Sequence, residues 1–427
     1  MSRTSPAGRS RLILPDLDSL AIQTRLVVRK SDKFTPGGFL QSLLSGTVTG
    51  KASFNQLASE LRERTGSGMS RQSLHERLDE RATAFLMAVL CALMEQRFKP
   101  VVTGHGEGAG AIRRLLVEDS SAQVLPKANA GSFPAHGNHH GKTAGVKIDF
   151  AIDLLAGTVV SHSLHHATAQ DKSLGRELLA EVRRGDLVLR DMGYFSLGEF
   201  TAIEEREAFW LTRLPLTTGV RLEGGGVLER RLKSRRHEVL DLPVVAGEEG
   251  KKCRLVAMRA APEVAAARRA ERRKKARECG KKPCPKGLVR DGWHLMLTNL
   301  TRGQAGVAKL AAIYRARWAI EIQFRAWKQA LNLGGALDRK SNRHHLEALV
   351  LAGMIAHQLG MQVARSLGAT VGRERLSYEK IYDLLATYLI KVRDFAGVSG
   401  FDPDPRYITR DKRARQSPVE SGIAALT

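Results

Sequence analysis

The sequence predicts an α/β protein in which a mixed sheet with helices on its faces follows a helical N-terminal segment. Helix-start residues and apolar positions three and four apart dominate the first 105 residues or so. From about residue 110, apolar runs alternate with helical patterns in the order strand, strand, strand, helix, strand, helix, strand. With 427 residues, of which 43% are hydrophobic, the chain can build one large or two to three modest domains.

The charge balance predicts a polyanionic partner. The chain has 68 Lys and Arg against 44 Asp and Glu, a formal charge of +24. Nucleic acid is favoured over an anionic membrane because no basic amphipathic helix stands out. The longest uninterrupted apolar run, FLMAVLCALM at 85–94, is about half of a bilayer span and is predicted to be a buried helix.

Cysteine usage predicts a reducing, cytoplasmic setting. Four cysteines in a chain of this length do not make a disulfide framework, and no secretory signal is recognised at the N-terminus. Cys279 and Cys284 stand in CGKKPC without a second ligand pair, so a zinc site is not expected there.

Residues 1–105 are predicted to form a helical, DNA-binding domain. Thr35 suits an N-cap before the first helical Pro36, Ser53 suits the next N-cap, and Ser70 can cap a long third helix. A glycine-containing turn between the last two makes a helix-turn-helix possible, although many helical hairpins bind nothing. Its candidate contact residues are Arg71, Gln72, His75 and Arg77.

Residues 106–215 are predicted to form the first part of the mixed sheet with its flanking helices. RRLLVED is the first strand and ends at Asp119, and VKIDFAIDLL and TVVSHSLHH form an antiparallel hairpin. A helix over DKSLGRELLAEVRRG, with Asp171 as its N-cap, precedes a short strand that runs to Asp191. SLGEFTAIEERE predicts another helix and AFWLTRLP a fifth strand.

Three further segments complete the predicted organisation. Residues 216–300 are a β-rich basic insertion with short strands and basic linkers, among them RRAERRKKAR. Residues 301–395 begin with a helix capped by Thr301, with Gln304 three positions later, and remain helical. Residues 396–427 are a basic flexible tail.

Two aspartates are the first candidates for chemistry. LLVED and LVLRD each place an acid, Asp119 and Asp191, two residues beyond an apolar triplet, which predicts the carboxyl end of a buried strand. Either could instead be a turn aspartate that caps the next segment. Together with Glu321, they could converge on divalent metal ions, for which Mg²⁺ prefers oxygen ligands.

The stretch YRARWAIEIQFRAWK at 314–328 predicts a helix with a polar stripe. Tyr314, Arg317, Glu321 and Lys328 fall within roughly a 60° arc. The stripe could be a solvated face with ion pairs such as Arg317 to Glu321. An apolar stripe for packing lies beside it, formed by Ile320, Phe324, Trp327 and Leu331.

The same four polar residues resemble the signature of DDE transposases of the insertion sequence 4 family. That signature is tyrosine, two residues, arginine, three residues, glutamate, six residues and lysine, and DMGYFS and VEDSS are similar to the family's second and first aspartate motifs. The resemblance runs from roughly residue 30 to 395. It implies a ribonuclease H-like fold in which a β-rich insertion precedes the glutamate helix, and a metal-binding catalytic triad of Asp119, Asp191 and Glu321.

The resemblance also implies cofactors and partners. The triad would hold two Mg²⁺ ions, with Mn²⁺ as a substitute, and would cut and rejoin double-stranded DNA at transposon ends and target. Tyr314, Arg317 and Lys328 would contact phosphates near the transposon end, and Trp293 would be a stacking platform for a flipped base, unless it is an ordinary strand tryptophan. A homodimer on DNA, in the bacterial cytoplasm at the nucleoid, is implied as well. The alternatives are a nuclease without strand transfer and a DNA-binding protein that has lost catalysis.

Other titratable residues leave alternatives open. Asp149 and Asp153 are rivals for the first aspartate, but both lie inside the predicted hairpin. HGNHH and HSLHH share the spacing H-x-x-H-H, which could bind metal, contact DNA or lie in solvated loops. The histidines concerned are His136, His139, His140, His162, His165 and His166.

Overall fold

The computed structural model describes residues 13–29, 32–66, 68–102, 112–138, 141–156, 158–234, 236–317 and 342–371, with residues 380, 384 and 387. The helices are α1 (Leu17–Gln23), α2 (Pro36–Thr49), α3 (Phe54–Thr65), α4 (Arg71–Arg77), α5 (Glu80–Val102), α6 (Asp171–Leu178), α7 (Leu197–Glu205), α8 (Leu228–Lys233), α9 (Pro262–Glu278), α10 (Pro285–Arg290), α11 (Val307–Ala316) and α14 (Arg343–Val371), with 3-10 turns η2 (Lys127–Asn129) and η3 (Met192–Tyr194). The strands are β1 (Arg114–Leu125), β2 (Pro134–Asn138), β3 (Gly141–Asp153), β4 (Thr158–His166), β5 (Asp186–Arg190), β6 (Phe209–Arg213), β7 (Val220–Leu222), β8 (Val239–Ala246), β9 (Lys251–Arg259) and β10 (Trp293–Thr298).

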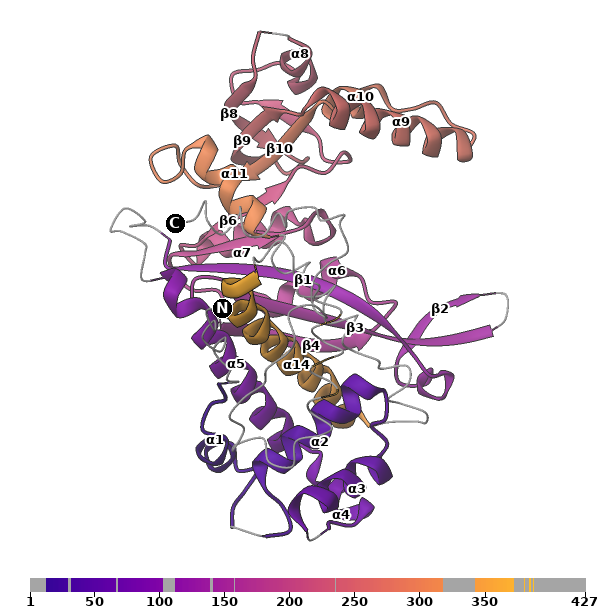
Figure 1. The fold of residues 1–427 in the computed structure, drawn as a ribbon. Helices are drawn as coiled ribbons and strands as arrows, with labels where there is room; N and C mark the ends of the chain where they lie inside the picture. The colour runs from indigo at the N-terminus through magenta and orange to yellow at the C-terminus, as the bar shows by residue number, and fades with distance from the viewer. Residues whose placement is uncertain are drawn as a thin grey trace, which may run out of the picture.

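The strands form one mixed sheet, so the predicted α/β class is confirmed. Its order is β2-β3-β1-β5-β6-β10-β9-β8-β7, and β4 also pairs with β3 (Figure 1). The pairs β1–β5 and β5–β6 are parallel, whereas β3–β4 is the predicted antiparallel hairpin. The strands of the predicted insertion continue this sheet because β10 pairs with β6.

Helices cover both faces of the sheet. Alternate residues of a strand point to opposite faces, and in β1 Leu115 and Val117 join the core cluster that includes α5 and α14. Leu116 joins the second cluster, with residues of α6, α7 and α8. Strand β1 is therefore buried on both faces.

Helix α14 is the central helix of the first core. It packs against α5 and α2, and the same cluster includes residues of α1, α3 and α4 (Figure 1). Its segment Arg343–Val363 is long and apolar enough to span a bilayer, but 83% of the apolar window is buried inside the protein. The N-terminal helices thus share a core with the sheet.

The predicted N-terminal caps are confirmed. The Thr35 hydroxyl accepts a hydrogen bond from the Gly38 N–H, 3.1 Å away, and Pro36 is the first residue of α2. Ser53 and Gln56 form a capping box at the start of α3. Each satisfies backbone donors that a helix start leaves without a partner.

The predicted long helix after Ser70 is two helices, so that expectation was wrong. Ser70 caps α4, whose last residue is Arg77 and whose C-cap is Leu78 (φ −80°, ψ 67°). The Asp79 carboxylate then accepts from the Arg81 and Ala82 N–H groups, and so caps α5. An N-cap inside an apolar pattern divides a helix that periodicity alone would join.

Three other local predictions need correction. The stretch RRAERRKKAR is helical, within α9, because Arg, Lys, Ala and Glu are all good helix formers. Gln170 is the N-cap of α6, and Asp171 is its first residue. Thr301 and Gln304 do make reciprocal capping hydrogen bonds, but α11 begins later, after Gly306.

Candidate active site

Parallel pairing of β1 and β5 brings Asp119 and Asp191 together. The last paired residues in that register are Glu118 and Arg190, and Asp119 and Asp191 directly follow them in the chain. β5 ends at this point, but β1 continues to Leu125 because its other neighbour, β3, pairs with it that far. Asp119 therefore lies inside β1, and the prediction that it ends the strand was wrong.

Arg317 is between the two aspartates. It caps the C-terminus of α11, with Nη1 3.9 Å from Asp119 Oδ2 and Nη2 4.0 Å from Asp191 Oδ1. The Arg317 side chain is 6% exposed, against 19% for Asp119 and 38% for Asp191. The alternative of a solvated face is therefore wrong for Arg317. The guanidinium is a sheltered counter-charge that faces two carboxylates partly open to solvent.

Tyr314 lies one turn before Arg317 and packs against the first core cluster. The Arg317 guanidinium carbon is 5.7 Å from the centroid of its ring. Burial raises the pKa of the Tyr314 hydroxyl to about 12, so it is a neutral phenol at physiological pH. Glu321 and Lys328 lie outside the described residues, as do the apolar stripe residues Ile320, Phe324, Trp327 and Leu331.

A buried charge network lies directly behind the aspartates. Arg190 Nε is 2.5 Å from Glu118 Oε2, and Arg190 Nη1 is 2.5 Å from Glu199 Oε2. Its Nη2 also donates to the carbonyl of Gly175 in α6. Burial raises the pKa of Glu118 above its usual range, against the opposing effect of Arg190. The network ties β1, β5, α6 and α7 together one residue before each aspartate.

Glu118, Arg190 and Glu199 were not among the predicted site residues. The sequence did contain a signal for two of them: Glu118 and Arg190 are charged residues that directly follow the apolar triplets in LLVED and LVLRD. Because alternate strand residues point to opposite faces, Glu118 must point away from Asp119. A charged residue on that covered face requires a buried partner.

The rival aspartates have structural roles. Asp149 is 2% exposed and accepts a hydrogen bond from the Tyr194 hydroxyl at 2.5 Å. Burial raises the pKa of Asp149 to about 6. Asp153 accepts from the backbone N–H of Leu115 and of Leu155. The Tyr194 contact anchors the DMGYFS turn, which begins with Asp191.

Trp293 lies in β10, in the second core cluster, and the structure does not bring it to the Asp119 and Asp191 pair. It is 3% exposed, and its Nε1 donates to the carbonyl of Leu232 at 3.1 Å. The Arg259 guanidinium covers its ring, 4.5 Å from the centroid. A strand tryptophan fits this position, and base stacking would first require that the ring be uncovered.

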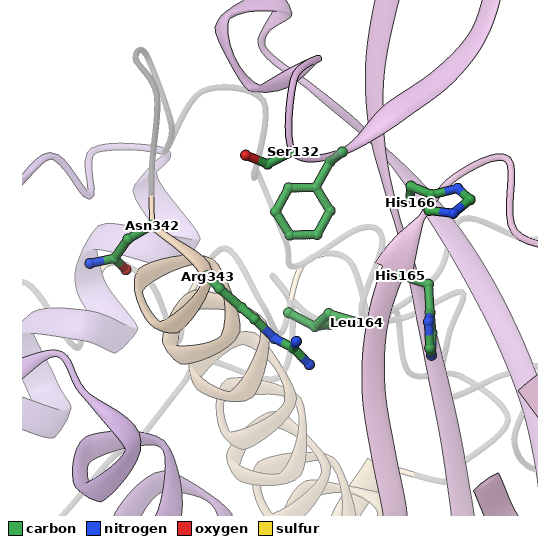
Figure 2. A pocket seen from close by; sticks show the side chains of 7 residues that line it. Ser132, Leu164, His165, His166, Asn342 and Arg343 are labelled. Atoms are coloured by element: carbon green, nitrogen blue, oxygen red, sulfur yellow. The ribbon is translucent and has the colours of Figure 1, made fainter.

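His162 and His165 interact with different partners. His162 Nε2 is 2.6 Å from Glu347 Oε1, and His165 Nε2 is 2.7 Å from Ser163 Oγ. His165 and His166 line a cavity of about 420 Å³ at the start of α14 (Figure 2). The other lining residues are Ser132, Phe133, Leu164, Asn342 and Arg343. In the part of the chain that the structure describes, no three His, Cys, Asp or Glu side chains group to hold a metal. His139 and His140 lie outside that part.

Comparisons with known proteins found a matching family and several relatives. The family described as Transposase DDE domain matches residues 110–359. The transposase for insertion sequence element IS231F of Bacillus thuringiensis subsp. israelensis is 26% identical over 357 residues, which cover 78% of this chain and 74% of that protein. The transposase for IS231D of Bacillus thuringiensis subsp. finitimus is 26% identical over 363 residues, covering 80% and 75%. Among solved structures, a piggyBac transposase synaptic complex with hairpin DNA matches with a TM-score of 0.39 and 12% identity, covering 88% of this chain and 76% of that one.

Proposed function

The chain belongs to the Transposase DDE domain family and is a DNA transposase of the insertion-sequence type, and from this we propose that it binds the terminal inverted repeats of its own element and catalyses metal-dependent strand cleavage and strand transfer. One observation carries the proposal: Asp119 and Asp191 follow the last paired residues of two parallel strands and share the counter-charge of Arg317. This places two acids at one point of a strongly basic protein.

We place the catalytic core in the ribonuclease H-like class. Its support is the strand order β4-β3-β1-β5-β6 in the sheet. Strands β1, β5 and β6 are parallel. Strands β3 and β4 form an antiparallel hairpin that lies on the other side of β1 from β5. Helices α6 and α7 precede β5 and β6 respectively, and join the same core cluster. The β-rich segment at 216–300 then enters between β6 and the helix that carries Tyr314 and Arg317.

The donor atoms present at this point fit Mg²⁺. Asp119 and Asp191 offer carboxylate oxygens that are sheltered yet reachable from solvent, and Glu321 is the third proposed ligand. When bound, two Mg²⁺ ions, or Mn²⁺ in their place, would supply positive charge at the attacking and leaving oxygens of a phosphodiester. Arg317 would hold both aspartates in position, and Tyr314 and Lys328 would contact the neighbouring phosphates.

Two reactions follow at the same site. In the first, water attacks the phosphodiester at the element end and releases a 3′-hydroxyl. In the second, that hydroxyl attacks a phosphodiester of the target DNA and displaces its 3′ oxygen, so each step breaks one P–O bond and forms one. A linear DNA with flanked element ends, incubated with protein, Mg²⁺ and a target plasmid, tests both. Cleavage without joined product would favour the nuclease alternative, and end binding without cleavage would favour the silent DNA-binding protein.

We assign end recognition to the α3–α4 segment. Arg71 and Gln72 are exposed at the start of α4, as a recognition helix requires. Arg77 instead lies over the Phe34 ring, 4.5 Å from its centroid, and stabilises the fold. The shared core of α5, α2 and α14 means that point substitutions in the full chain, such as Arg71→Ala with Gln72→Ala, are the suitable test of recognition.

The affinity for DNA is expected to fall steeply with salt. A protein of charge +24 that neutralises many phosphates releases as many counterions, so we expect a loss of at least roughly tenfold between about 0.05 and 0.2 M salt. Fluorescence anisotropy with labelled duplex measures it. A flat salt response would contradict binding through phosphates.

Arg317→Ala is expected to reduce cleavage at least roughly tenfold. The change removes the charge that lies 3.9 Å from Asp119 and 4.0 Å from Asp191. Single-turnover cleavage of the flanked ends measures it. Arg315→Ala is the matched control, because Arg315 is exposed on the same turn and should leave the rate unchanged. Equal rates for folded Arg317→Ala and wild-type protein would exclude Arg317 from the site.

We also propose a homodimer in the DNA complex and a cytoplasmic, nucleoid-associated location. Family membership supports the dimer, and the free state of Cys91, Cys253, Cys279 and Cys284 supports a reducing compartment. The mass of the complex with a single element end and with paired ends would measure the number of protein chains bound.

A further inference from the structure

Helix α9 is exposed on almost every side. Only Ala265 is buried among its residues, which is unusual because most helices of globular proteins bury an apolar stripe. Figure 1 shows α9 and α10 extending away from strands β8 to β10, at the opposite end of the molecule from α3 and α4. A polar helix in this position is not explained by core packing.

The inner side of α9 is held by arginines. Arg272 Nε and Nη2 donate to the two carboxylate oxygens of Asp291, both at 2.6 Å. Arg269 Nε donates to the carbonyl of Leu288 at 3.0 Å. A bidentate arginine–carboxylate pair fixes orientation as well as distance. These contacts attach α9 to α10 and its C-cap, Asp291.

Two glycines make that attachment close. A Cβ on Gly287 would lie 2.9 Å from Arg272 Nε, and one on Gly292 would lie 2.8 Å from Arg269 Nη2. The guanidinium groups therefore rest on bare backbone at both positions. The outer side of α9 is presented in one fixed orientation.

That outer side is cationic. Arg273, Lys274 and Arg277, called here the α9 outer face, are exposed and fall within roughly a 100° arc. Lys274 has a distant partner in Glu278 at 3.9 Å. In the part of the chain that the structure describes, no carboxylate lies within 4.0 Å of Arg273 or Arg277. Like charges four residues apart destabilise a helix. The Arg273 and Arg277 pair therefore lowers the stability of α9 unless an anion lies against it.

The charge is concentrated around this face. Residues 262–286 have ten Lys or Arg and three Glu, a net charge of +7 out of +24 for the chain. Toward the N-terminus of α9, the same side of the helix continues with alanines, Ala270 and Ala266. Such a surface can neutralise phosphates, whose contacts fix the position of a duplex without carrying sequence information.

We propose that the α9 outer face binds the phosphate backbone of a DNA duplex, without sequence preference, as a second DNA contact separate from the α3–α4 segment. The inference rests on the proposed function and adds to it a surface for DNA outside the terminal repeat. That DNA is either the donor sequence that flanks the element or the target, which share the same backbone chemistry.

The test compares two double variants of the full chain. Arg273→Gln/Arg277→Gln removes two charges from the outer face, and Arg230→Gln/Arg231→Gln removes two from exposed positions of α8 in the same insertion. For a duplex without element ends, we expect the α9 variant to lose at least roughly fivefold in affinity and about 1.8 in the slope of log affinity against log salt. The α8 variant should stay within about twofold of wild type. Both should keep the wild-type melting temperature.

Two results would overturn the inference. The α9 variant could keep wild-type affinity and slope, or the α8 variant could lose as much, which would show a general effect of net charge. These failures differ from failure of the proposed function, in which wild-type protein itself would bind no duplex. Element ends with long and short flanks, and a separate target duplex, distinguish the source of the DNA: a deficit confined to long flanks identifies flanking DNA, and a deficit confined to the target identifies target DNA.

Discussion

Replacing Asp191 by alanine is expected to lower cleavage of the element ends to below about 0.1% of the wild-type rate, while binding of the ends is retained. The reason is that the three proposed ligands share two cations, so loss of one carboxylate removes both charge and geometry. Asp119→Ala and Glu321→Ala should have the same effect. The measurement is single-turnover cleavage beside an anisotropy titration with the same DNA.

A matched control is available in α1. Asp18 is exposed and far from the site in sequence, so Asp18→Ala removes the same group and should cleave at the wild-type rate. Wild-type cleavage by any one of the three triad variants would remove that residue from the site. Loss of end binding together with cleavage would instead indicate that the variant has misfolded.

Replacing Arg190 by methionine is expected to lower the free energy of unfolding by about 3–5 kcal/mol. The substitution leaves Glu118 and Glu199 buried without the cation that contacts both at 2.5 Å. Urea denaturation followed by circular dichroism measures the loss. The combined variant Glu118→Gln/Arg190→Met/Glu199→Gln is the control, since it removes the uncompensated charges and should recover part of the stability.

The pH dependence of the free energy of unfolding distinguishes the loss of the Arg190 ion pairs from a simple loss of packing. Burial raises the pKa of Glu118 above its usual 4.5, so the folded state retains a proton that the unfolded state releases. Stability should therefore fall as pH rises above about 4.5, more steeply in Arg190→Met than in wild type. An Arg190→Met protein as stable as wild type, or one whose deficit is the same at every pH, would contradict the account.

Local pattern was enough to predict the elements that carry the site. Apolar triplets before Asp119 and Asp191 predicted two strands. Both strands are present at the predicted places, and only the C-terminal end of β1 differs clearly from the prediction. The continuation of β1 through SSAQVL was not predictable, because those polar residues are extended only where β3 pairs with them. The parallel register that places the aspartates side by side joins strands some seventy residues apart, and no local propensity encodes it.

The direction of a polar residue was harder to predict than its spacing. Helical periodicity placed Tyr314 and Arg317 on one stripe, but a stripe that faces solvent and one that faces carboxylates have the same period. Only the tertiary structure decides between them, because it places Arg317 beside Asp119 and Asp191. Arg190 was missed for a related reason. A charged residue at the end of an apolar run suggests an exposed strand end, but the Arg190 side chain is buried against α6 and α7.

The pairing of β6 with β10 has a consequence for how the protein is made. β6 leaves the ribosome long before β10, since residues 214–292 are synthesised between them. Until then the apolar strand FWLTR has an open edge, a feature that promotes aggregation. The Thr298 hydroxyl and the Asn299 side chain bond to the Trp210 backbone, at 2.6 and 2.9 Å, only when that stretch has emerged. Arg317 and α14 follow later still. A nascent chain that stops within the insertion would therefore expose an aggregation-prone strand edge and would lack Arg317, the counter-charge of Asp119 and Asp191.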